Sequence, residues 1–397
     1  MKVLVVGCGR IGSPLLTWLA HRNQVSDCFE FINGVDVDAS ITDKPVTARF
    51  NEIGWEEMLH GLSYRPWILS YQAASTLGPQ DVAIITCGTP VDNNQNPNTD
   101  QLTLAIHSLI KMNLINENTL VILRSTLFPG GTKWLRNHIS NKYDINLKLI
   151  MAPERIAEGY TFTEIDKVPQ IVGIDEQASA SVDSLTKEAI DFFTKFGSSD
   201  IIVLGPKDGG STAAELAKLM CNTWRYVQFS TANEFAIISD ELGIKYDAVR
   251  DACNKGYWRA GIPKAGLNVG GPCLGKDAKI LAAFTKNATI TESAYSVSEK
   301  TPIHFLNKED VSNKTVGVLG LAFKRNSDNK VNSLSYKLIK HLEVRQPRAI
   351  KVHDPKIMHK YSESLDEVVD CDIVFVMTEH NEYANLNFSS KTKVIRL

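Results

Sequence analysis

The sequence predicts an α/β protein in three parts: a doubly wound parallel sheet, a long-helix region, and a smaller second sheet domain. Three observations lead to this prediction. Short apolar strands alternate with helical stretches, one helix runs for more than thirty residues, and a second series of buried strands follows it. A chain of 397 residues has room for two or three domains. We place the parts at residues 1–205, 206–301 and 302–397.

The first part alternates strand-like and helical segments up to about residue 205. Its strands are short and continuously apolar, which is typical of a mainly parallel sheet with helices on both faces. The expected strands are residues 3–6, 31–37, 82–86, 120–123, 148–151 and 170–174.

The second part is dominated by one helix, from about residue 208 to residue 242. This stretch contains no proline, and its apolar residues recur at helical spacing. Helices of this length often line a subunit interface or bridge domains. The third part begins at a buried strand, 315–321, and continues with an expected helix at 333–342 and strands at 349–353 and 372–377.

Composition and cysteine usage exclude several classes of partner. The formal net charge of −2 gives no electrostatic case for nucleic acid or a membrane surface, and no apolar window approaches 18 residues. The seven cysteines are scattered and contain no C-x-x-C pair, so we expect neither a disulfide framework nor a metal site. Free thiols without a signal peptide fit a cytoplasmic protein.

A glycine motif directly follows the first strand and opens a helix. The first Gly permits a tight turn, the second lets the backbone approach a pyrophosphate, and the third packs helix on strand. Asp36 ends the next strand, where a carboxylate grips ribose hydroxyls and repels a 2′-phosphate. The pattern favours a Rossmann-type NAD site over a plain glycine turn beside a surface Asp. The motif reads Gly7-Cys8-Gly9-Arg10-Ile11-Gly12.

A second glycine-rich turn holds one thiol. Glycine lets the backbone approach a ligand closely, and a nearby cation raises the fraction of reactive thiolate. Cys273 is therefore a candidate nucleophile, whereas most of the other cysteines are expected to be small core residues. The turn runs Gly270-Gly271-Pro272-Cys273-Leu274-Gly275-Lys276-Asp277.

Two polar residues, Lys218 and Asn222, are spaced i and i+4 within the apolar run of the long helix and project from one face. On their own they fit a solvated face equally well. With the Cys273 turn, a shared pocket becomes the better interpretation, in which Lys218 stabilises a developing alkoxide and Asn222 helps to orient it.

Several motifs in consistent order resemble the UDP-glucose/GDP-mannose dehydrogenases, the nucleotide-sugar 6-dehydrogenases. The resemblance spreads over nearly the whole chain. Besides the two glycine turns, it rests on Cys87-Gly88-Thr89-Pro90-Val91-Asp92, Arg124-Ser125-Thr126-Leu127-Phe128-Pro129-Gly130-Gly131-Thr132, Ala152-Pro153-Glu154-Arg155-Ile156-Ala157-Glu158-Gly159, Glu215-Leu216-Ala217-Lys218-Leu219-Met220-Cys221-Asn222 and Gly320-Leu321-Ala322-Phe323-Lys324.

The resemblance implies a four-electron oxidation of the C6 hydroxymethyl group of a nucleotide sugar to the uronic acid, with NAD as acceptor and a role in polysaccharide biosynthesis. The sugar is held on Cys273, first as a thiohemiacetal and then as a thioester. The implied roles are Cys273 as nucleophile, Lys218 and Asn222 as oxyanion donors, Glu154 and Asp277 as water-activating groups, and Thr126 as a hydroxyl near the reacting centre.

The resemblance also implies ligand contacts. Arg259 is expected to reach a neighbouring subunit's site, which implies a homodimer or a higher homo-oligomer. The Pro-Glu-Arg form at Arg155 is closer to the branch acting on UDP-N-acetylhexosamines. Cofactor contacts fall on the glycine motif, Asp36, Thr89, Thr126 and Glu158, and sugar-nucleotide contacts on Glu154, Arg155, Lys218, Asn222, Arg259, 264–270 and Lys324.

Two stretches depart from the family pattern. Where relatives carry D-x-R-x-S-P, this chain has Asn329 and Val331 in place of the acid and the arginine. It also ends at Leu397, where relatives continue into an arginine-containing segment. These departures leave the third domain's contribution to both ligands in question.

Alternatives remain for single residues and for the whole chain. Glu154 and Arg155 can be read as a surface ion pair, and Asp277 as a helix cap. A two-electron hydroxy-acid or 6-phosphogluconate-type dehydrogenase also pairs Lys with Asn, but it needs no nucleophilic cysteine. A non-catalytic nucleotide-binding relative would explain the departures in the third part.

Overall fold

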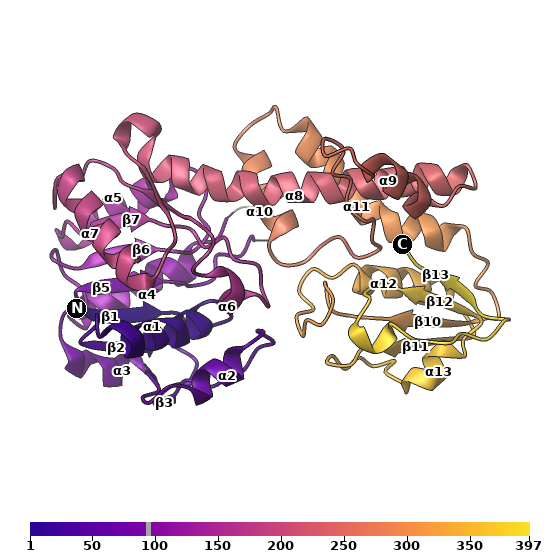
Figure 1. Ribbon diagram of the computed structural model, residues 1–397, viewed down its shortest axis with the longest axis horizontal. Coiled ribbons are helices and arrows are strands. Elements are labelled where there is room, and N and C mark those ends of the chain that lie inside the picture. Colours follow the sequence, from indigo (N-terminus) through magenta and orange to yellow (C-terminus); the bar gives the residue numbers. More distant parts are fainter. Residues whose placement is uncertain (93–96) are drawn as a thin grey trace. The chain divides into compact units, whose positions relative to one another are not determined.

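The computed structural model describes residues 1–92 and 97–397 (Figure 1). The chain folds as two compact units, Met1–Leu219 and Met220–Leu397, and each contains one β-sheet. Helix α8 (Gly210–Glu241) begins in the first unit and ends in the second. The α/β class and the single long helix are therefore confirmed.

The first unit is built on a nine-stranded, mainly parallel sheet. Its order is β3-β4-β2-β1-β5-β6-β7-β8-β9, with antiparallel pairs at β3–β4 and β7–β8. The six expected strands are present, while β3, β4 and β9 were not predicted. The strands are β1 (Lys2–Val6), β2 (Phe31–Val35), β3 (Lys44–Pro45), β4 (Trp67–Leu69), β5 (Val82–Ile85), β6 (Leu120–Leu123), β7 (Lys148–Met151), β8 (Gln170–Gly173) and β9 (Ile201–Leu204).

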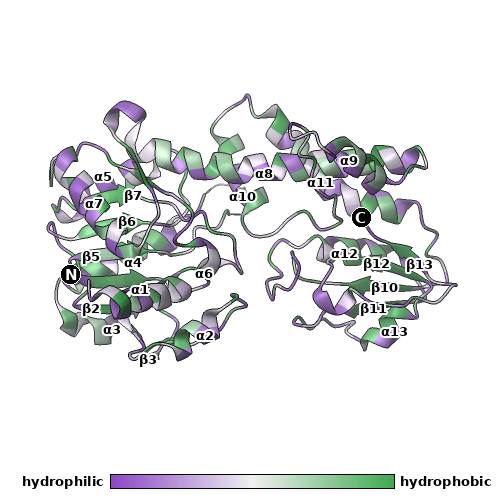
Figure 2. Cartoon of the chain, in the orientation of Figure 1, coloured by the Kyte–Doolittle hydropathy of each residue, from purple (hydrophilic) through white to green (hydrophobic). Residues whose placement is uncertain are grey.

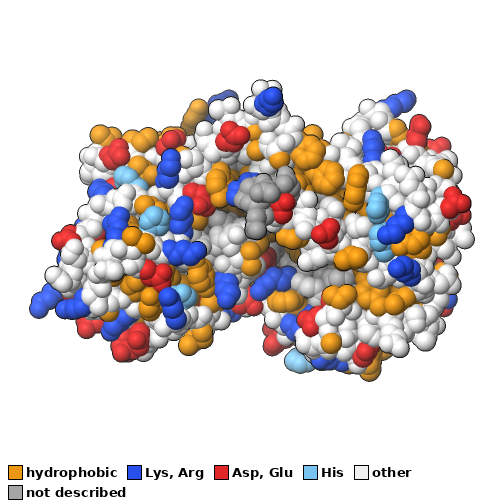
Figure 3. Space-filling model, turned by 180° about the vertical axis from the view of Figure 1, so that it is seen from behind, with side chains coloured by type: hydrophobic (Ala, Val, Ile, Leu, Met, Phe, Trp, Pro, Cys, Tyr) orange, Lys and Arg blue, Asp and Glu red, His pale blue; other side chains and the backbone are white. Residues whose placement is uncertain are grey.

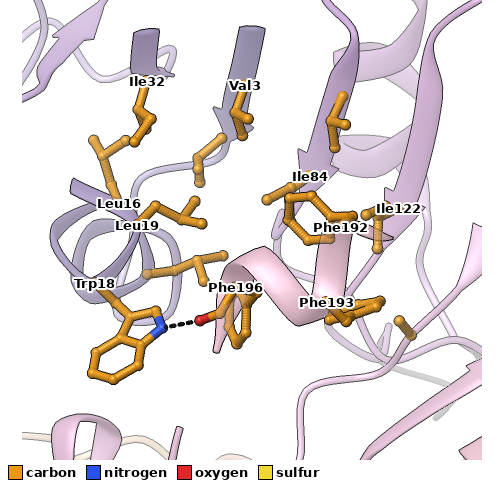
Figure 4. Packing of buried hydrophobic residues seen from close by; sticks show 14 of the residues in the cluster. Val3, Leu16, Trp18, Leu19, Ile32, Ile84, Ile122, Phe192, Phe193 and Phe196 are labelled. Carbon is orange, nitrogen blue, oxygen red and sulfur yellow. Dashed lines mark hydrogen bonds between the residues drawn. The ribbon is translucent and has the colours of Figure 1, made fainter. Parts of the chain in front are cut away.

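Helices pack against this sheet through two apolar clusters of buried side chains. In one of them the Nε1–H of Trp18 donates to the carbonyl of Phe196 over 2.9 Å, which ties α1 to α7 (Figure 4). The helices of this unit are α1 (Gly12–Ser26), α2 (Trp55–His60), α3 (Tyr71–Ala74), α4 (Asp100–Lys111), α5 (Gly131–Tyr143), α6 (Thr161–Glu164) and α7 (Val182–Phe196), with 3-10 turns at Ser75–Leu77 and Pro206–Asp208.

The second unit carries a four-stranded parallel sheet in the order β11-β10-β12-β13. The chain leaves β10 toward β11 on one side and returns to β12 on the other. A reversal of this kind opens a crevice at the carboxyl ends of the two central strands. The elements are α9 (Tyr246–Asn254), α10 (Leu274–Ala283), α11 (Thr289–Asn307), β10 (Thr315–Leu319), α12 (Ser335–Arg345), β11 (Ala349–His353), α13 (Leu365–Val369), β12 (Ile373–Val376), a 3-10 turn (Asn381–Tyr383) and β13 (Lys393–Ile395).

Most strands of the two sheets are apolar, which fits burial on both faces, whereas the short edge strand β3 is exposed (Figure 2). On the face drawn in Figure 3, basic and acidic side chains are interspersed, in keeping with the net charge of −2. Among the described helices, none is both long and apolar enough to cross a bilayer.

Candidate active site

The glycine motif forms the turn between β1 and α1. Gly7 has a φ of +88°, in the left-handed region that side chains rarely adopt. A Cβ on Gly12 would lie 2.1 Å from the Gly7 carbonyl oxygen, so the close packing of helix on turn requires glycine. At Gly9 no described atom lies within 4 Å of the Cβ position. The turn thus leaves open space at the residue that a pyrophosphate approaches.

Asp36 follows β2 and its carboxylate binds this turn. Oδ2 accepts the N–H of Cys8 over 2.6 Å, and Oδ1 accepts the N–H of Asp38 over 2.9 Å. The carboxylate borders a cavity of about 410 Å³ with both polar and apolar walls. Its lining is Gly7, Gly9, Asp36, Val37, Tyr71, Thr86, Cys87, Gly88, Gln101, Leu104, Ala105 and Ser108.

This cavity suits NAD. The Asp36 carboxylate matches ribose hydroxyls and would repel a 2′-phosphate, while apolar side chains such as Leu104 offer a surface for a base. Thr89 and Thr126, both expected at the cofactor, are joined by a 2.6 Å bond from the Thr89 hydroxyl to the Thr126 carbonyl. This bond joins two segments far apart in sequence, and neither threonine is among the residues that line the cavity.

Arg10 and Glu158, two further expected cofactor residues, also lie together. The guanidinium of Arg10 is 3.4 Å from the Glu158 carboxylate and 4.6 Å from the centre of the Phe50 ring. Arg10 is thus held between an acid and an aromatic face beside the glycine turn.

Glu154 is bound by a buried arginine. Arg124 directs Nε (3.1 Å) and Nη2 to Oε2 of Glu154, and its Nη1 donates to Gln170 over 3.0 Å. Oε1 of Glu154 accepts the N–H groups of Arg155 and Ile156. The surface ion pair with Arg155 that the sequence left open is absent among the described contacts, because Arg124 takes that place.

The environment of Glu154 keeps it ionised. Burial alone would raise the pKa of this carboxyl, but the charge and hydrogen bonds of Arg124 outweigh it. The Ile156 amide and the Lys218 ammonium act in the same direction, so the pKa lies below its ordinary value. Glu154 and Lys218 therefore belong to one electrostatic group in the first unit.

The start of α8 is fixed to the first unit by a second buried acid, Glu215. Its carboxylate accepts the N–H groups of Gly130 and Thr132 and the Thr132 hydroxyl, each over 2.6 Å. Burial raises the pKa of Glu215, and these bonds only partly offset it. Because Glu215 lies one turn before Lys218, it locates that buried lysine relative to the start of α5.

In the second unit, α8 and α10 bring three expected residues into one cluster. Cys273 is exposed and immediately precedes α10, where the partial charge of a helix N-terminus favours an anionic sulfur. Asp277, in the first turn of α10, is fully buried and accepts a 2.6 Å bond from the amide of Asn222. Lys276 lies 3.3 Å from its other oxygen.

Comparison with known proteins decides the family. Residues 1–190 match the NAD binding domain of the UDP-glucose/GDP-mannose dehydrogenase family, residues 212–301 its central domain, and residues 317–396 its UDP binding domain. The chain belongs to this family. It is an NAD-dependent nucleotide-sugar dehydrogenase, and its substrate is a nucleotide sugar.

Individual relatives agree with this assignment. UDP-N-acetyl-D-mannosamine dehydrogenase of Methanocaldococcus jannaschii is 29% identical, over 99% of this chain and 90% of the relative. The UDP-N-acetyl-D-mannosamine dehydrogenase of Pyrococcus horikoshii is 26% identical, over 100% of this chain and 93% of the relative. The solved UDP-D-ManNAc dehydrogenase of P. horikoshii superposes with a TM-score of 0.81 at 25% identity, covering 98% of this chain and 91% of that one. A UDP-glucose dehydrogenase of Pyrobaculum islandicum shares the fold, with a TM-score of 0.81 at 22% identity over 100% and 94%.

The remaining family positions have contacts of different kinds. The guanidinium of Arg155 donates to the Pro169 carbonyl. That of Arg259 lies 4.6 Å from the ring centre of Trp258, which is 81% exposed. The ammonium of Lys324 is 5.8 Å from the Phe323 ring centre. Gly270 packs so closely on the Asn332 carbonyl that a Cβ would lie 2.6 Å from it.

The departing stretch 329–334 is ordered within the second unit. Asn329 is buried, and its side-chain oxygen accepts the Val331 N–H over 3.0 Å. The Val331 side chain is half exposed. Near the end of the chain, Ile395 is buried in β13, and Arg396 pairs with Glu379 over 3.3 Å.

Sequence reasoning missed the supporting groups. Neither Arg124 nor Glu215 is predicted to have a role from the sequence. For Arg124 a usable signal exists, because it is a charged residue directly after an apolar strand. Tyr71 and Gln101, which line the cofactor cavity, carry no motif of their own and are placed there only by the fold.

Proposed function

We propose that this dehydrogenase oxidises the C6 hydroxymethyl group of a UDP-N-acetylhexosamine to the uronic acid through a thioester on Cys273. The carrying observation is the exposed Cys273 at the start of α10, one turn from the buried Asn222–Asp277 pair. A dehydrogenase that stops at an aldehyde or ketone needs no such thiol. The substrate branch rests on the names of the relatives, since Arg155 is bound to Pro169.

The proposed steps assign one task to each side chain. The C6 hydroxyl loses its proton and the carbon a hydride, giving the aldehyde, while Lys218 and Asn222 stabilise charge on the oxygen. The Cys273 thiolate then forms a C–S bond to the aldehyde carbon, and the resulting alkoxide takes up a proton. The thiohemiacetal hydroxyl then gives up its proton as a second hydride leaves this carbon, which gives the thioester. NAD supplies the hydride acceptor for both oxidations.

Hydrolysis completes the proposed sequence. Water adds to the thioester carbon, the C–S bond breaks, and the carboxylic acid and the thiol are released. Asp277 and Glu154 are the proposed water-activating groups, with Thr126 close to the reacting centre. Since Arg124 holds Glu154 ionised, its contribution is a fixed negative charge and hydrogen-bond acceptor rather than a large swing in protonation.

Counting NADH tests the proposal. The protein is incubated with NAD and a panel of UDP- and GDP-sugars, and NADH is measured against sugar consumed. Two NADH per UDP-N-acetylhexosamine support the thioester route, one indicates a two-electron dehydrogenase, and none across the panel indicates a non-catalytic relative. C273S should stop acid release. Unchanged turnover by C273S would overturn the covalent step.

We infer that the protein forms a homodimer or higher homo-oligomer through the exposed face of α8. Leu216, Met220 and Trp224 are spaced one turn apart and are 36%, 56% and 63% exposed. W224E should lower the sedimentation mass to that of one chain, whereas V344E, at an apolar residue of α12 that is 83% exposed, should not. An unchanged mass for W224E would refute this interface.

We further propose a cytoplasmic location, and we retain the three-part division at 1–205, 206–301 and 302–397. Six cysteines that serve no proposed catalytic role are free thiols, which fits a reducing compartment: Cys8, Cys28, Cys87, Cys221, Cys253 and Cys371. Fractionation of cells expressing the tagged protein tests the location. Limited proteolysis near residues 205 and 301 tests the boundaries.

A further inference from the structure

Asn268 is a buried polar residue in the segment that connects α9 to α10. Both the oxygen and the nitrogen of its carboxamide form hydrogen bonds with residues of the C-terminal sheet domain of the same unit. Oδ1 accepts the Leu334 N–H over 2.6 Å. Nδ2 donates to the Ala322 carbonyl (2.8 Å), and it lies within bonding distance of the hydroxyls of Thr378 (2.9 Å), Ser333 (3.0 Å) and Ser335 (3.3 Å).

These partners sit at one place in the sheet. Ala322 follows β10, and Thr378 follows β12. These are the two central strands, and the chain continues from them to opposite edges of the sheet. Ser333 and Ser335 flank the start of α12. Asn268 therefore inserts its side chain at the carboxyl ends of the central strands, where open parallel sheets bind ligands. In this family the same sheet belongs to the UDP binding domain.

The glycines before Cys273 make a second contact with that domain. The N–H of Gly271 donates to the Asn332 carbonyl over 3.2 Å. A Cβ on Gly271, whose φ is +90°, would lie 2.4 Å from the ring of Phe323. The turn is thus pressed against two segments, the one after β10 and the one before α12. These are the segments that the Asn268 carboxamide joins.

We propose that Asn268 is a positioning residue that couples nucleotide binding by the C-terminal domain to the placement of Cys273. The inference rests on the proposed function of Cys273 and assigns no substrate contact to Asn268. A uridine nucleotide at the carboxyl ends of β10 and β12 orders the segments that the carboxamide joins. The contacts of Asn268 and Gly271 with these segments then fix the position of the Cys273 thiol, which lies five residues after Asn268.

The chemistry of the site explains why an amide is needed. Ala322 offers only a carbonyl acceptor and Leu334 only an N–H donor, so the site requires one donor and one acceptor on the same planar group. Aspartate would set a carboxylate oxygen against the Ala322 carbonyl, and alanine would leave both backbone groups buried without this partner. The asparagine carboxamide satisfies both the Ala322 carbonyl and the Leu334 N–H. It thereby binds the loop before Cys273 to the C-terminal sheet domain.

The test measures coupling rather than turnover. Cys273 in the full-length protein is alkylated with iodoacetamide, with and without UDP, and followed by peptide mass spectrometry because Cys221 and Cys253 are also exposed. In the wild type we expect UDP to change the alkylation rate of Cys273 at least fivefold. In N268D and N268A this effect should fall below twofold, while UDP still binds by calorimetry and kcat falls at least tenfold.

Two further variants separate coupling from stability. S298A removes a buried 2.7 Å bond between α11 and Ser230 of α8, and should lower Tm yet keep the UDP effect. T378V removes one partner of Asn268 and should weaken the UDP effect even if N268A fails to fold. A full UDP effect in N268A, or in T378V where N268A does not fold, overturns the proposal. Failure of the proposed function shows separately, as missing NADH with an intact UDP effect.

Discussion

The Arg124–Glu154 pair offers a quantitative test of the reasoning about the first unit. The side chains are 1% and 11% exposed, and Arg124 also holds Gln170. R124M keeps much of the side-chain volume but leaves the Glu154 carboxylate buried without its counter-charge. Removing one partner of a buried pair costs about 3–5 kcal/mol. We therefore expect the free energy of unfolding to fall by this amount at neutral pH.

The control is a surface pair of the same unit. K195M breaks the Lys195–Asp191 pair, whose side chains are 33% and 53% exposed, and should cost less than about 1 kcal/mol. Urea unfolding followed by circular dichroism measures both. The double variant R124M/E154Q also removes the unpaired negative charge of Glu154 and should recover part of the lost free energy of unfolding.

The same substitution has a kinetic consequence with a definite sign. Without Arg124, burial raises the pKa of Glu154 and is opposed only by the Ile156 amide and the Lys218 ammonium. The acid limb of the kcat profile should therefore move to higher pH in R124M, because Glu154 then becomes protonated at a higher pH. A loss of stability below about 1 kcal/mol together with an unchanged acid limb would refute the assigned role of Arg124.

Three further predictions concern single sites. Asp354, bound to His380 and to the amides of Leu321 and Ala322, has a pKa of about 2 despite its burial, against an ordinary 3.8. Its contribution of about 2 kcal/mol is present above pH 3.8 and is lost as the pH falls toward 2; D354N should therefore be destabilised in urea at pH 7 and match the wild type near pH 2, and an equal deficit at both pH values would contradict this. G12A should abolish NAD binding in calorimetry, because its Cβ meets the Gly7 carbonyl; retained affinity would show that the turn adapts. D277N should lower kcat at least tenfold with little change in the Kd for UDP. Unchanged turnover would leave Asp277 only the structural role of accepting the Asn222 amide, since the N-cap of α10 is Cys273 and not Asp277.

The central features of this protein follow from local sequence. The glycine motif, Asp36 and the Cys273 turn are contiguous or regularly spaced, because each depends on backbone geometry that neighbouring residues set. The apolar runs of the buried strands and the proline-free stretch of α8 are likewise local signals. The strands that were not predicted, such as β3 and β9, lie at the edges of the sheet, where burial and hence the apolar pattern are weaker.

The sequence by itself determined the fold class and the cofactor NAD, and it predicted the residues of the NAD site and the candidate nucleophile. Only the tertiary structure showed that Arg124 rather than Arg155 pairs with Glu154, that Glu215 anchors the start of α8, and that Asn268 joins the Cys273 turn to the C-terminal domain. These contacts link residues distant along the chain, and such pairings leave no periodic mark on the sequence. These hydrogen bonds and ion pairs are strong because the low dielectric of the interior strengthens the attraction between the paired groups. Only the packed fold brings such partners together.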